Sequence, residues 1–252
     1  MTPELCIVTA YDEKYSKMAR FCVESIQRYA AGHKLASCVG RIGHAGLDSG
    51  RPPAWEKISA ILEVFRRGYP WALWIDADAA FVRFDVDVRP EFGWKEKDLY
   101  LVIGQHVEGR PNGMVHQCDQ PCTGFMLVRN CAWSIQFLQD MWERTEFTNH
   151  CWWELAAFIQ LAGIHLQYDG QMKDLGVRQL LDMADPARPF RQKVEIDAHI
   201  GRLHQRWNCT DQGEWTRKLD PIVRHYTGSN GSFNTRLMLA NSDYFRIFNR
   251  HL

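Results

Sequence analysis

Short apolar runs alternate with amphipathic stretches along the first two thirds of the chain. The runs are rich in β-branched and aromatic residues, which is typical of strands buried on both faces of a sheet. The stretches between them place apolar residues at helical spacing and predict helices with one buried face. Strands are predicted at residues 5–10, 35–39, 71–75, 98–103, 124–128 and 164–168, and helices at 15–30, 54–67, 132–144, 151–161 and 174–183.

This alternation predicts an α/β fold with a mostly parallel central sheet and helices on both faces. Periodicity is weaker after residue 183, where a strand at 222–226 and a helix at 244–252 are predicted. Segments 40–53 and 104–122 are rich in glycine, proline and polar residues and are predicted as loops. No repeat or long linker divides the chain, so residues 1–252 are expected to form a single domain.

Composition narrows the classes of function. Thirty basic residues balance thirty acidic ones, which argues against a nucleic-acid-binding protein, because that class needs a basic surface. Hydrophobic residues make up 46% of the chain, so disorder throughout is excluded. No apolar run approaches the ~20 residues of a membrane-spanning helix, and the N-terminus lacks the basic region of a signal peptide. We expect a cytoplasmic protein, free or peripheral at a membrane, or a luminal one whose anchor was removed.

The eight cysteines are scattered without a Cys-x-x-Cys pair, which predicts reduced and mostly buried thiols. Cys118 and Cys122 lie near His116, but no second ligand pair follows at a zinc-ribbon spacing, so a structural zinc site is not expected. Asn208 and Asn230 each begin an Asn-x-Ser/Thr pattern, which would be glycosylated only in a secretory compartment.

Two carboxylates, Asp76 and Asp78, directly follow the apolar run 71–75. Ionised carboxylates this close repel each other and are costly to bury unless a cation neutralises them. Mg²⁺ and Mn²⁺ prefer hard oxygen ligands and would suit the pair, and either ion would also neutralise a diphosphate. In sheets of this kind, ligands lie at the carboxyl ends of the strands, where this pair is expected. The alternative is a solvated turn in which one of the carboxylates caps a helix or accepts bonds from local amides.

Five short motifs stand in order along the chain and resemble one enzyme family. They are Trp55-Glu56-Lys57-Ile58, the run ending in Asp76-Ala77-Asp78, Cys122-Thr123-Gly124 with the strand through Arg129-Asn130, Trp152-Trp153-Glu154, and His225-Tyr226-Thr227-Gly228. Together they resemble the galactosyl-, mannosyl- and xylosyltransferases of the fungal Golgi and of plant xyloglucan synthesis, over roughly residues 5–230. These are retaining glycosyltransferases of the GT-A fold. The resemblance therefore implies that fold and a nucleotide-sugar donor held by Mn²⁺, with Mg²⁺ as the substitute.

The resemblance also implies roles for the matching acidic residues. Asp76 would bond the ribose or an ion-bound water and join Asp78 and His225 around the metal. Asp78 and Glu154 would be catalytic, with Glu154 acting as a nucleophile or as a stabiliser that faces the donor sugar. The alternatives are a buried histidine bonded to backbone for His225 and an exposed helix face for Glu154.

Further positions would bind the nucleotide sugar. The implied residues are Thr9 and Tyr11 for the base and ribose, Lys57 for the ribose or a phosphate, Thr123 and Gly124 for the donor sugar, and Gly228 for close approach to the diphosphate. A solvated helix lysine is the alternative for Lys57. Trp152, Trp153 and Trp207 could stack on sugar rings or belong to the core, and Asn208 could contact the donor or acceptor.

Two positions depart from the family pattern. Cys122 stands where the family usually has Asn or Asp before Thr-Gly, which bears on the contacts to the sugar. The lysine that related enzymes place a few residues after Gly228 is missing. Arg236, or the amides of the Gly/Ser-rich turn before it, would have to hold the diphosphate instead.

These observations predict a metal-dependent, retaining glycosyltransferase, hexosyl or pentosyl, that moves a sugar from a nucleotide sugar to a glycan or glycolipid hydroxyl. Galactose and UDP are the first choices of sugar and nucleotide. Residues 1–100 would mainly bind the nucleotide, and residues 101–252 the donor sugar and acceptor. The alternative is a nucleotide- or carbohydrate-binding protein of the same fold without turnover. Glycosidases are discounted because their two carboxylates flank the sugar, about 5–9.5 Å apart.

Overall fold

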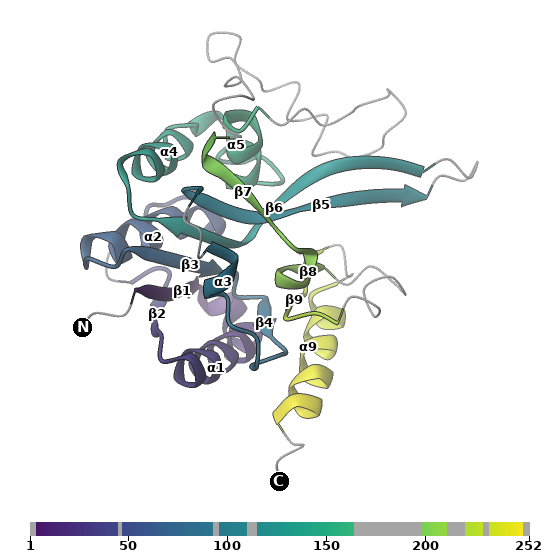
Figure 1. The fold of residues 1–252 in the computed structure, drawn as a ribbon. Helices are drawn as coiled ribbons and strands as arrows, with labels where there is room; N and C mark the ends of the chain where they lie inside the picture. Colours follow the sequence, from purple (N-terminus) through teal and green to yellow (C-terminus); the bar gives the residue numbers. More distant parts are fainter. Residues whose placement is uncertain are drawn as a thin grey trace.

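A six-stranded sheet forms the centre of the molecule (Figure 1). The computed structural model describes residues 4–44, 47–92, 96–109, 115–163, 198–210, 220–228 and 232–248. In spatial order the strands are β2 (Ala36–Arg41), β1 (Leu5–Tyr11), β3 (Trp71–Ile75), β6 (Val115–Arg129), β5 (Leu99–Gly109) and β7 (Ile200–Leu203). Strand β6 runs antiparallel to both of its neighbours, and the other pairs are parallel. The predicted α/β fold with a mostly parallel sheet is confirmed.

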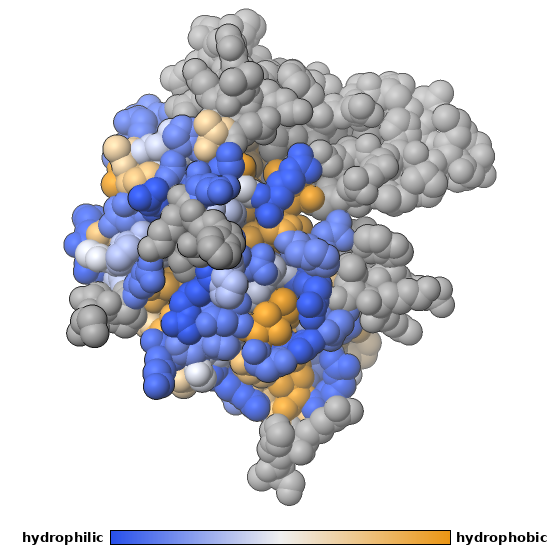
Figure 2. Space-filling model, in the orientation of Figure 1, coloured by the Kyte–Doolittle hydropathy of each residue, from blue (hydrophilic) through white to orange (hydrophobic). Residues whose placement is uncertain are grey.

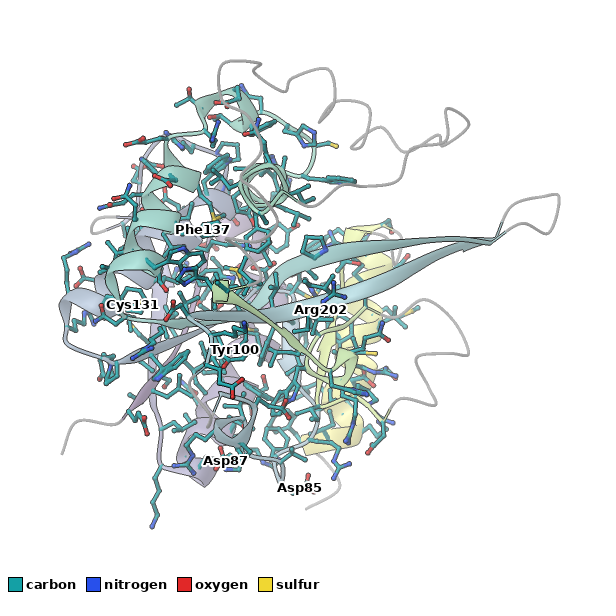
Figure 3. The ribbon with its side chains drawn as sticks, turned by 45° about the horizontal axis from the view of Figure 1, so that its top comes forward. Asp85, Asp87, Tyr100, Cys131, Phe137 and Arg202 are labelled. Atoms are coloured by element: carbon teal, nitrogen blue, oxygen red, sulfur yellow. The ribbon has the colours of Figure 1, made fainter. Side chains whose placement is uncertain are left out.

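Two helical layers cover the two faces of this sheet. Alternate residues of a strand point to opposite faces, so Ile7 and Val8 of β1 belong to different apolar clusters. Tyr100 of β5 and Phe137 of α4 likewise lie on opposite sides of the sheet (Figure 3). The layers are formed by α1 (Ser16–His33) on one face and by α2 (Glu56–Arg66), α4 (Ala132–Trp142) and α5 (Glu154–Leu161) on the other. Burial on both faces explains why β1 and β3 are almost entirely apolar.

A second, three-stranded sheet brings a late part of the chain to the end of β3. Its strands, in the order β4-β9-β8, are β4 (Ala79–Phe81), β9 (Val223–His225) and β8 (Cys209–Thr210). Strand β9 runs antiparallel to β4, and Ala79 is paired with His225. Because β4 starts immediately after Asp78, this register places His225 beside the carboxylate pair. Helix α9 (Phe233–Phe248) packs against α1 next to this sheet (Figure 1).

Short helical segments complete the described part of the chain. They are η1 (Glu13–Tyr15), η2 (Pro53–Trp55), α3 (Arg89–Phe92), η3 (Thr145–Phe147) and η4 (Gln205–Trp207). The predicted strands up to residue 128 and the predicted helices up to residue 161 are confirmed. Their bounds differ by a few residues, except that β5 ends later and β6 begins earlier than predicted. The strand predicted at 222–226 is β9, and the terminal helix begins earlier than predicted, at Phe233. The strand at 164–168 and the helix at 174–183 lie outside the described residues.

The prediction of a loop at residues 104–122 is wrong. Strand β5 continues to Gly109 and β6 begins at Val115, so this polar segment is a long hairpin that extends from the body of the molecule (Figures 1 and 3). Antiparallel pairing satisfies the hydrogen bonds of the backbone whatever the polarity of the side chains. The hairpin starts from the buried residues Leu99–Val102 of β5, and the pairing continues from there into the polar segment. The short strands β4, β7 and β8 were not predicted, because such brief segments carry no periodicity.

On the face shown in Figure 2, the described residues are mostly hydrophilic, with smaller hydrophobic areas between them. Exposed large apolar side chains among the described residues are few: Val39, Trp153, Met238 and Phe245. In the part of the chain that the structure describes, none of the helices combines the length and apolarity that crossing a membrane requires.

Candidate active site

The carboxylate pair lies where β3 turns into β4. The backbone N–H of Asp76 donates to the carbonyl of Gly124 on β6 (2.9 Å), and the carbonyl of Asp76 accepts from the N–H of Ala79 (2.9 Å). These two bonds close the turn that carries Asp78. Asp76 and Asp78 therefore leave the carboxyl end of a buried strand together, as the sequence predicts.

Asp76, Asp78 and His225 form one cluster. One ligand atom from each, a carboxylate oxygen or an imidazole nitrogen, lies within 4.8 Å of the others. The Nε2 atom of His225 is 3.1 Å from Asp78 Oδ1 and 3.7 Å from Asp76 Oδ2. His225 is 5% exposed, whereas both carboxylates are only half-buried. The structure thus brings together the three residues predicted to hold a metal.

Gly124 makes this close arrangement possible. A Cβ atom at this position would lie 2.2 Å from His225 Cε1 and 2.7 Å from His225 Nδ1. The same atom would be 3.0 Å from Asp76 Oδ2. Any side chain here would therefore displace His225, so glycine is required at the point where β6 passes behind the cluster.

Arg236 of α9 lies against the other oxygen of Asp78. Its Nη1 atom is 3.2 Å from Asp78 Oδ2 and donates to the carbonyl of Tyr226, also at 3.2 Å. The side chain is 10% exposed, and in the part of the chain that the structure describes its buried Nε atom has no hydrogen-bond partner. The arginine considered as a substitute for the missing lysine is therefore part of the cluster's surroundings.

Lys57 is buried between two carboxylates. Its Nζ atom is 3.2 Å from Asp76 Oδ1 and 2.5 Å from Glu154 Oε1, and the side chain is 2% exposed. Burial by itself would lower the pKa of the amine, but Asp76 and Glu154 outweigh it and raise that pKa. The alternative of a solvated helix lysine is therefore wrong. The ammonium remains charged and joins Asp76 to Glu154.

Glu154 begins α5 and is also buried. Its Oε1 atom accepts from Lys57 and from the hydroxyl of Thr123 (3.0 Å), whereas Oε2 is buried without a hydrogen-bond partner among the described residues. Burial raises the pKa of this carboxyl, and the nearby Lys57 ammonium offsets that rise only in part. The alternative of an exposed helix face is therefore wrong. Trp153, just before it, has a φ of 47°, a conformation that is strained for a residue other than glycine.

Charged neighbours favour the charged forms of His225 and Asp76 in this cluster. Burial would lower the pKa of the His225 imidazole, but the Asp78 carboxylate outweighs it and holds that pKa well above its ordinary value. Burial would raise the pKa of Asp76, but Lys57 and His225 lower it. In this state a proton on His225 offsets the negative charge of the pair.

The other residues predicted to bind the nucleotide differ in exposure. Thr9 is fully buried at the end of β1, with its hydroxyl 3.9 Å from Cys22 Sγ, so it supports the strand from inside. Tyr11, two residues on, is half-buried under the guanidinium of Arg41. Gly228 is exposed, and no atom lies within 4 Å of where a Cβ would be.

The three tryptophans and Asn208 also differ in how deeply they are buried. Trp207 is 1% exposed and stacks on Phe125 inside the core, which leaves no face for a sugar. Trp152 is half-buried against the core, and Trp153 is 43% exposed. Asn208 is 4% exposed and bonded to His225, so its glycosylation pattern is inaccessible in the folded chain. Asn230 lies outside the described residues.

Two residues that support Asp76 were not predicted. Trp74 Nε1 donates to Asp76 Oδ1 (2.6 Å), and the thiol of Cys22 donates to the carbonyl of Asp76 (3.2 Å). Trp74 could have been found from the sequence, because residues two apart on a strand face the same side. Cys22 lies on α1, and nothing in the sequence pattern connects that helix to this turn.

The cluster suits a divalent cation. Two carboxylates and an imidazole form a ligand set common for Mn²⁺, and like charges so close need a cation between them. The absence of a side chain on Gly124 keeps the approach of His225 open. By these criteria of chemistry and space, the residues present fit the predicted metal.

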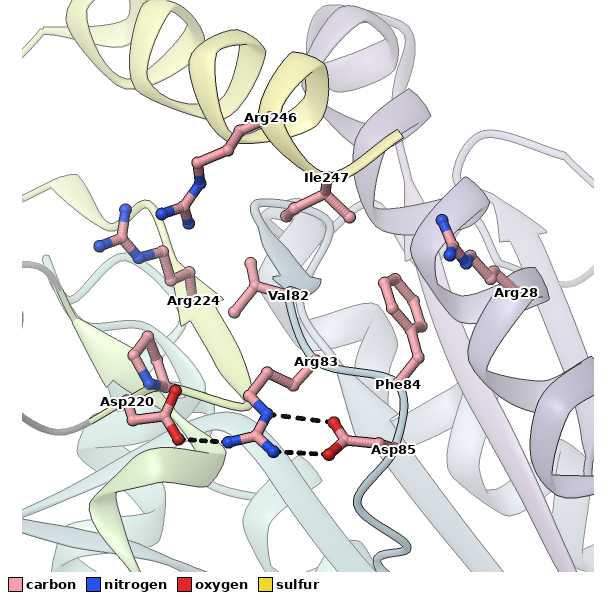
Figure 4. Close-up of a pocket in the computed structure, with 10 residues that line it drawn as sticks. Arg28, Val82, Arg83, Phe84, Asp85, Asp220, Arg224, Arg246 and Ile247 are labelled. Atoms are coloured by element: carbon pink, nitrogen blue, oxygen red, sulfur yellow. Dashed lines mark hydrogen bonds and ion pairs between the residues drawn. The ribbon is translucent and has the colours of Figure 1, made fainter. Parts of the chain in front are cut away.

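A separate open hollow of about 880 Å³ lies at the far end of β4 (Figure 4). It is lined by four arginines, Arg28, Arg83, Arg224 and Arg246. Arg83 bonds to Asp85 and Asp220, and Arg224 and Arg246 both pair with Asp243. Three of the four positive charges are thus already matched by carboxylates, which indicates a network that stabilises the fold here.

Comparison with family models matches residues 53–183, just over half of the chain, to the nucleotide-diphospho-sugar transferases. The chain belongs to this family. The match includes Lys57, Asp76, Asp78 and Glu154, four of the residues around the site. A comparison with curated protein sequences finds no match.

Solved structures of glycosyltransferases share the fold of this transferase. One is a glycosyltransferase involved in glycosylation of the major capsid of PBCV-1, with a TM-score of 0.57 and 12% identity over 94% of this chain and 98% of that one. Another is the bifunctional glycosyltransferase WbbM, with a TM-score of 0.53 and 12% identity over 99% of this chain and 52% of that one. The GT-A fold is thereby confirmed, whereas the narrower resemblance to fungal and plant enzymes stays a prediction.

Proposed function

We propose that this transferase is a metal-dependent, retaining glycosyltransferase that moves a sugar from a UDP-sugar to a hydroxyl of a glycan or glycolipid. Galactose is the first choice among hexoses and pentoses. The observation that carries this proposal is the cluster of Asp76, Asp78 and His225 at the carboxyl end of β3. Together with the family, it supports a donor whose diphosphate is held through a divalent ion.

In this proposal Asp76, Asp78 and His225 hold Mn²⁺ or Mg²⁺. The bound ion would supply Lewis-acid stabilisation of the departing diphosphate. Arg236 offers a second positive charge next to Asp78, with a buried Nε–H that no described residue bonds. We assign it the diphosphate contact of the missing lysine, with Gly228 leaving room for the approach of the donor.

Glu154, Thr123 and Gly124 would face the donor sugar. The Oε1 atom of Glu154 accepts from Lys57 and Thr123, while Oε2 is a buried acceptor that no described residue bonds. A sugar hydroxyl would satisfy that oxygen, because a buried acceptor gains most from a donor that enters with the ligand. The 3% exposure of Glu154 and its pairing with Lys57 favour a stabilising role over a nucleophilic one.

The remaining assignments concern the nucleotide and the division of the chain between donor and acceptor. Tyr11, with Thr9 buried beneath the same strand end, would lie on the side of the nucleotide base and ribose. Residues 1–100 would mainly bind the nucleotide and 101–252 the donor sugar and acceptor, within one domain. A place in the cytoplasm, next to a membrane that carries glycan acceptors, agrees with this proposal.

The test is donor turnover across a panel of nucleotide sugars. Release of UDP or GDP is measured from UDP-galactose, UDP-glucose, UDP-xylose and GDP-mannose, with Mn²⁺ and with a chelator. We expect decay of one UDP-sugar with Mn²⁺ and a loss of at least about 100-fold in Asp78→Ala, because the metal contribution is worth several kcal/mol. Asp85→Ala, at an exposed aspartate outside the site, is the matched control.

Each outcome separates the enzyme from the alternative. Binding of a nucleotide sugar without decay, with or without Mn²⁺, would identify a binding protein of the same fold. Decay that persists in the chelator and in Asp78→Ala would contradict the metal site. Decay of GDP-mannose alone would keep the enzyme and the metal but change the donor.

A further inference from the structure

Both ring nitrogens of His225 are bonded in defined directions. Nε2 faces Asp78 Oδ1 at 3.1 Å, and Nδ1 lies 2.9 Å from Oδ1 of Asn208. His225 and Asn208 are 5% and 4% exposed, so water does not compete strongly for these bonds. The direction in which the side-chain amide of Asn208 points therefore decides which nitrogen carries the hydrogen when the His225 ring is neutral.

The amide of Asn208 is held from its other end. Its Nδ2 atom donates to the carbonyl of Cys122 (3.4 Å), which leaves Oδ1 facing the imidazole. The backbone is fixed as well, because Asn208 N–H donates to Gln205 at 3.2 Å and the next residues form β8. In that strand Thr210 pairs with His225, so the pairing of β8 with β9 fixes the position of Asn208 relative to His225.

An amide oxygen can only accept, so Nδ1 must carry the hydrogen of this bond. Without a metal, Nε2 also carries a hydrogen, directed at Asp78. When a cation takes the place of that hydrogen, the neutral imidazole keeps the one on Nδ1, and Nε2 presents its lone pair to the space between Asp76 and Asp78. The sulfur of Cys122, 3.8 Å from Nδ1, accepts from the same side and does not change this result. A metal ligand needs this arrangement, with the lone pair directed at the ion.

We propose that Asn208 is a positioning residue that holds His225 in the metal-ligating tautomer and orientation. This inference rests on the proposed function, in which His225 binds the metal. Partners of this kind orient ligating histidines in many metal sites, and their loss typically costs about 10–100-fold in metal affinity. The role differs from the substrate contact that the sequence suggested for Asn208.

The test is Mn²⁺ binding without donor, measured by electron paramagnetic resonance. Asn208→Leu removes the acceptor and keeps a side chain of similar size, and we expect Mn²⁺ affinity to fall about 10–100-fold. Spin-echo modulation from an imidazole nitrogen should be clear on Mn²⁺ bound to the parent and weak or absent in Asn208→Leu. Asn208→Asp keeps an oxygen acceptor and should retain both Mn²⁺ affinity and the nitrogen signal.

Thr210→Val is the matched control, because it changes a side chain on β8 and leaves the amide of Asn208 in place. Parent-like Mn²⁺ affinity and nitrogen modulation in Asn208→Leu would overturn the inference while leaving the proposed function intact. An equal loss in Thr210→Val would also overturn it, since any disturbance of β8 would then suffice. No Mn²⁺ binding by the parent would instead remove the metal from the proposed function, and this inference with it.

Discussion

At the scale of single residues, Gly124 is the position where one added carbon should matter most. Gly124→Ala would place a Cβ 2.2 Å from His225 Cε1, which forces the ring away from the carboxylates. We expect Mn²⁺ affinity to fall at least about 10-fold and the free energy of unfolding to fall by about 1–3 kcal/mol, as in other overpacked sites. Metal titration and urea unfolding measure the two effects.

The control for this substitution is Gly32→Ala on α1. A Cβ at Gly32 meets no atom within 4 Å, and alanine favours a helix more than glycine does. Gly32→Ala should therefore be neutral or slightly stabilising and should bind Mn²⁺ like the parent. Equal behaviour of the two variants would show that β6 and His225 do not need their close contact.

Lys57 carries a second prediction at this scale. Lys57→Met would leave the buried carboxylate of Glu154 and the half-buried one of Asp76 without their shared cation. Removing one partner of a buried ion pair typically costs about 3–5 kcal/mol, and we expect a loss of that size in urea unfolding at neutral pH. The two carboxyls should then have raised pKa values in the folded state. The destabilisation should shrink as the pH falls and they become protonated.

A double variant separates charge from packing at Lys57. Lys57→Met with Glu154→Gln removes one of the stranded charges, and it should regain part of the stability that Lys57→Met loses. If the double variant were no more stable than the single one, the loss would come from packing of the lysine chain. Lys14, on η1 at the surface, provides a control Lys→Met substitution with an expected effect within about 0.5 kcal/mol.

At the scale of elements, α9 is joined to β9 through one buried carboxylate. Asp243 accepts from the hydroxyl of Tyr226 (2.8 Å) and pairs with Arg224 (2.8 Å) and Arg246 (3.2 Å). Asp243→Ala would leave the hydroxyl of Tyr226 buried and unpaired, so we expect a loss of about 1–3 kcal/mol in urea unfolding. The neighbouring Ser242→Ala, on the exposed face, should stay within about 0.5 kcal/mol. Similar values for both would assign the attachment of α9 to its apolar contacts and to Arg236.

The same scale shows how far the sequence could predict this molecule. Strand β3 and helix α2 follow from periodicity, because burial on both faces of the strand and on one face of the helix leaves a local pattern. The hairpin of β5 and β6 leaves none, since antiparallel backbone pairing can form whatever the polarity of the side chains. The contact of Asn208 with His225 was equally hidden. It depends on the pairing of β8 with β9, and two-residue strands carry no signal.

At the scale of the whole molecule, the site is assembled from segments far apart in the sequence. Asp76 and Asp78 follow β3, Gly124 comes from β6, and His225 from β9 in the second sheet. Lys57 on α2 and Arg236 on α9 bring charges from an early and a late part of the chain. A ligand that bridges these groups would connect the two sheets, so its binding should stabilise the complete fold rather than one element.

This connection predicts a thermal shift with Mn²⁺ and UDP together. At ligand concentrations of about 100 times the dissociation constant, linkage gives about 2.7 kcal/mol of stabilisation, which corresponds to a rise in Tm of about 5–10 °C for a chain of this size. The rise should disappear in Asp78→Ala and persist in Asp85→Ala. UDP with a chelator should give little of it, because the diphosphate then meets two carboxylates without a cation. An equal shift with UDP in the chelator would mean that the charges of Arg236 and Lys57 suffice for the diphosphate, and that the carboxylate cluster serves the fold instead.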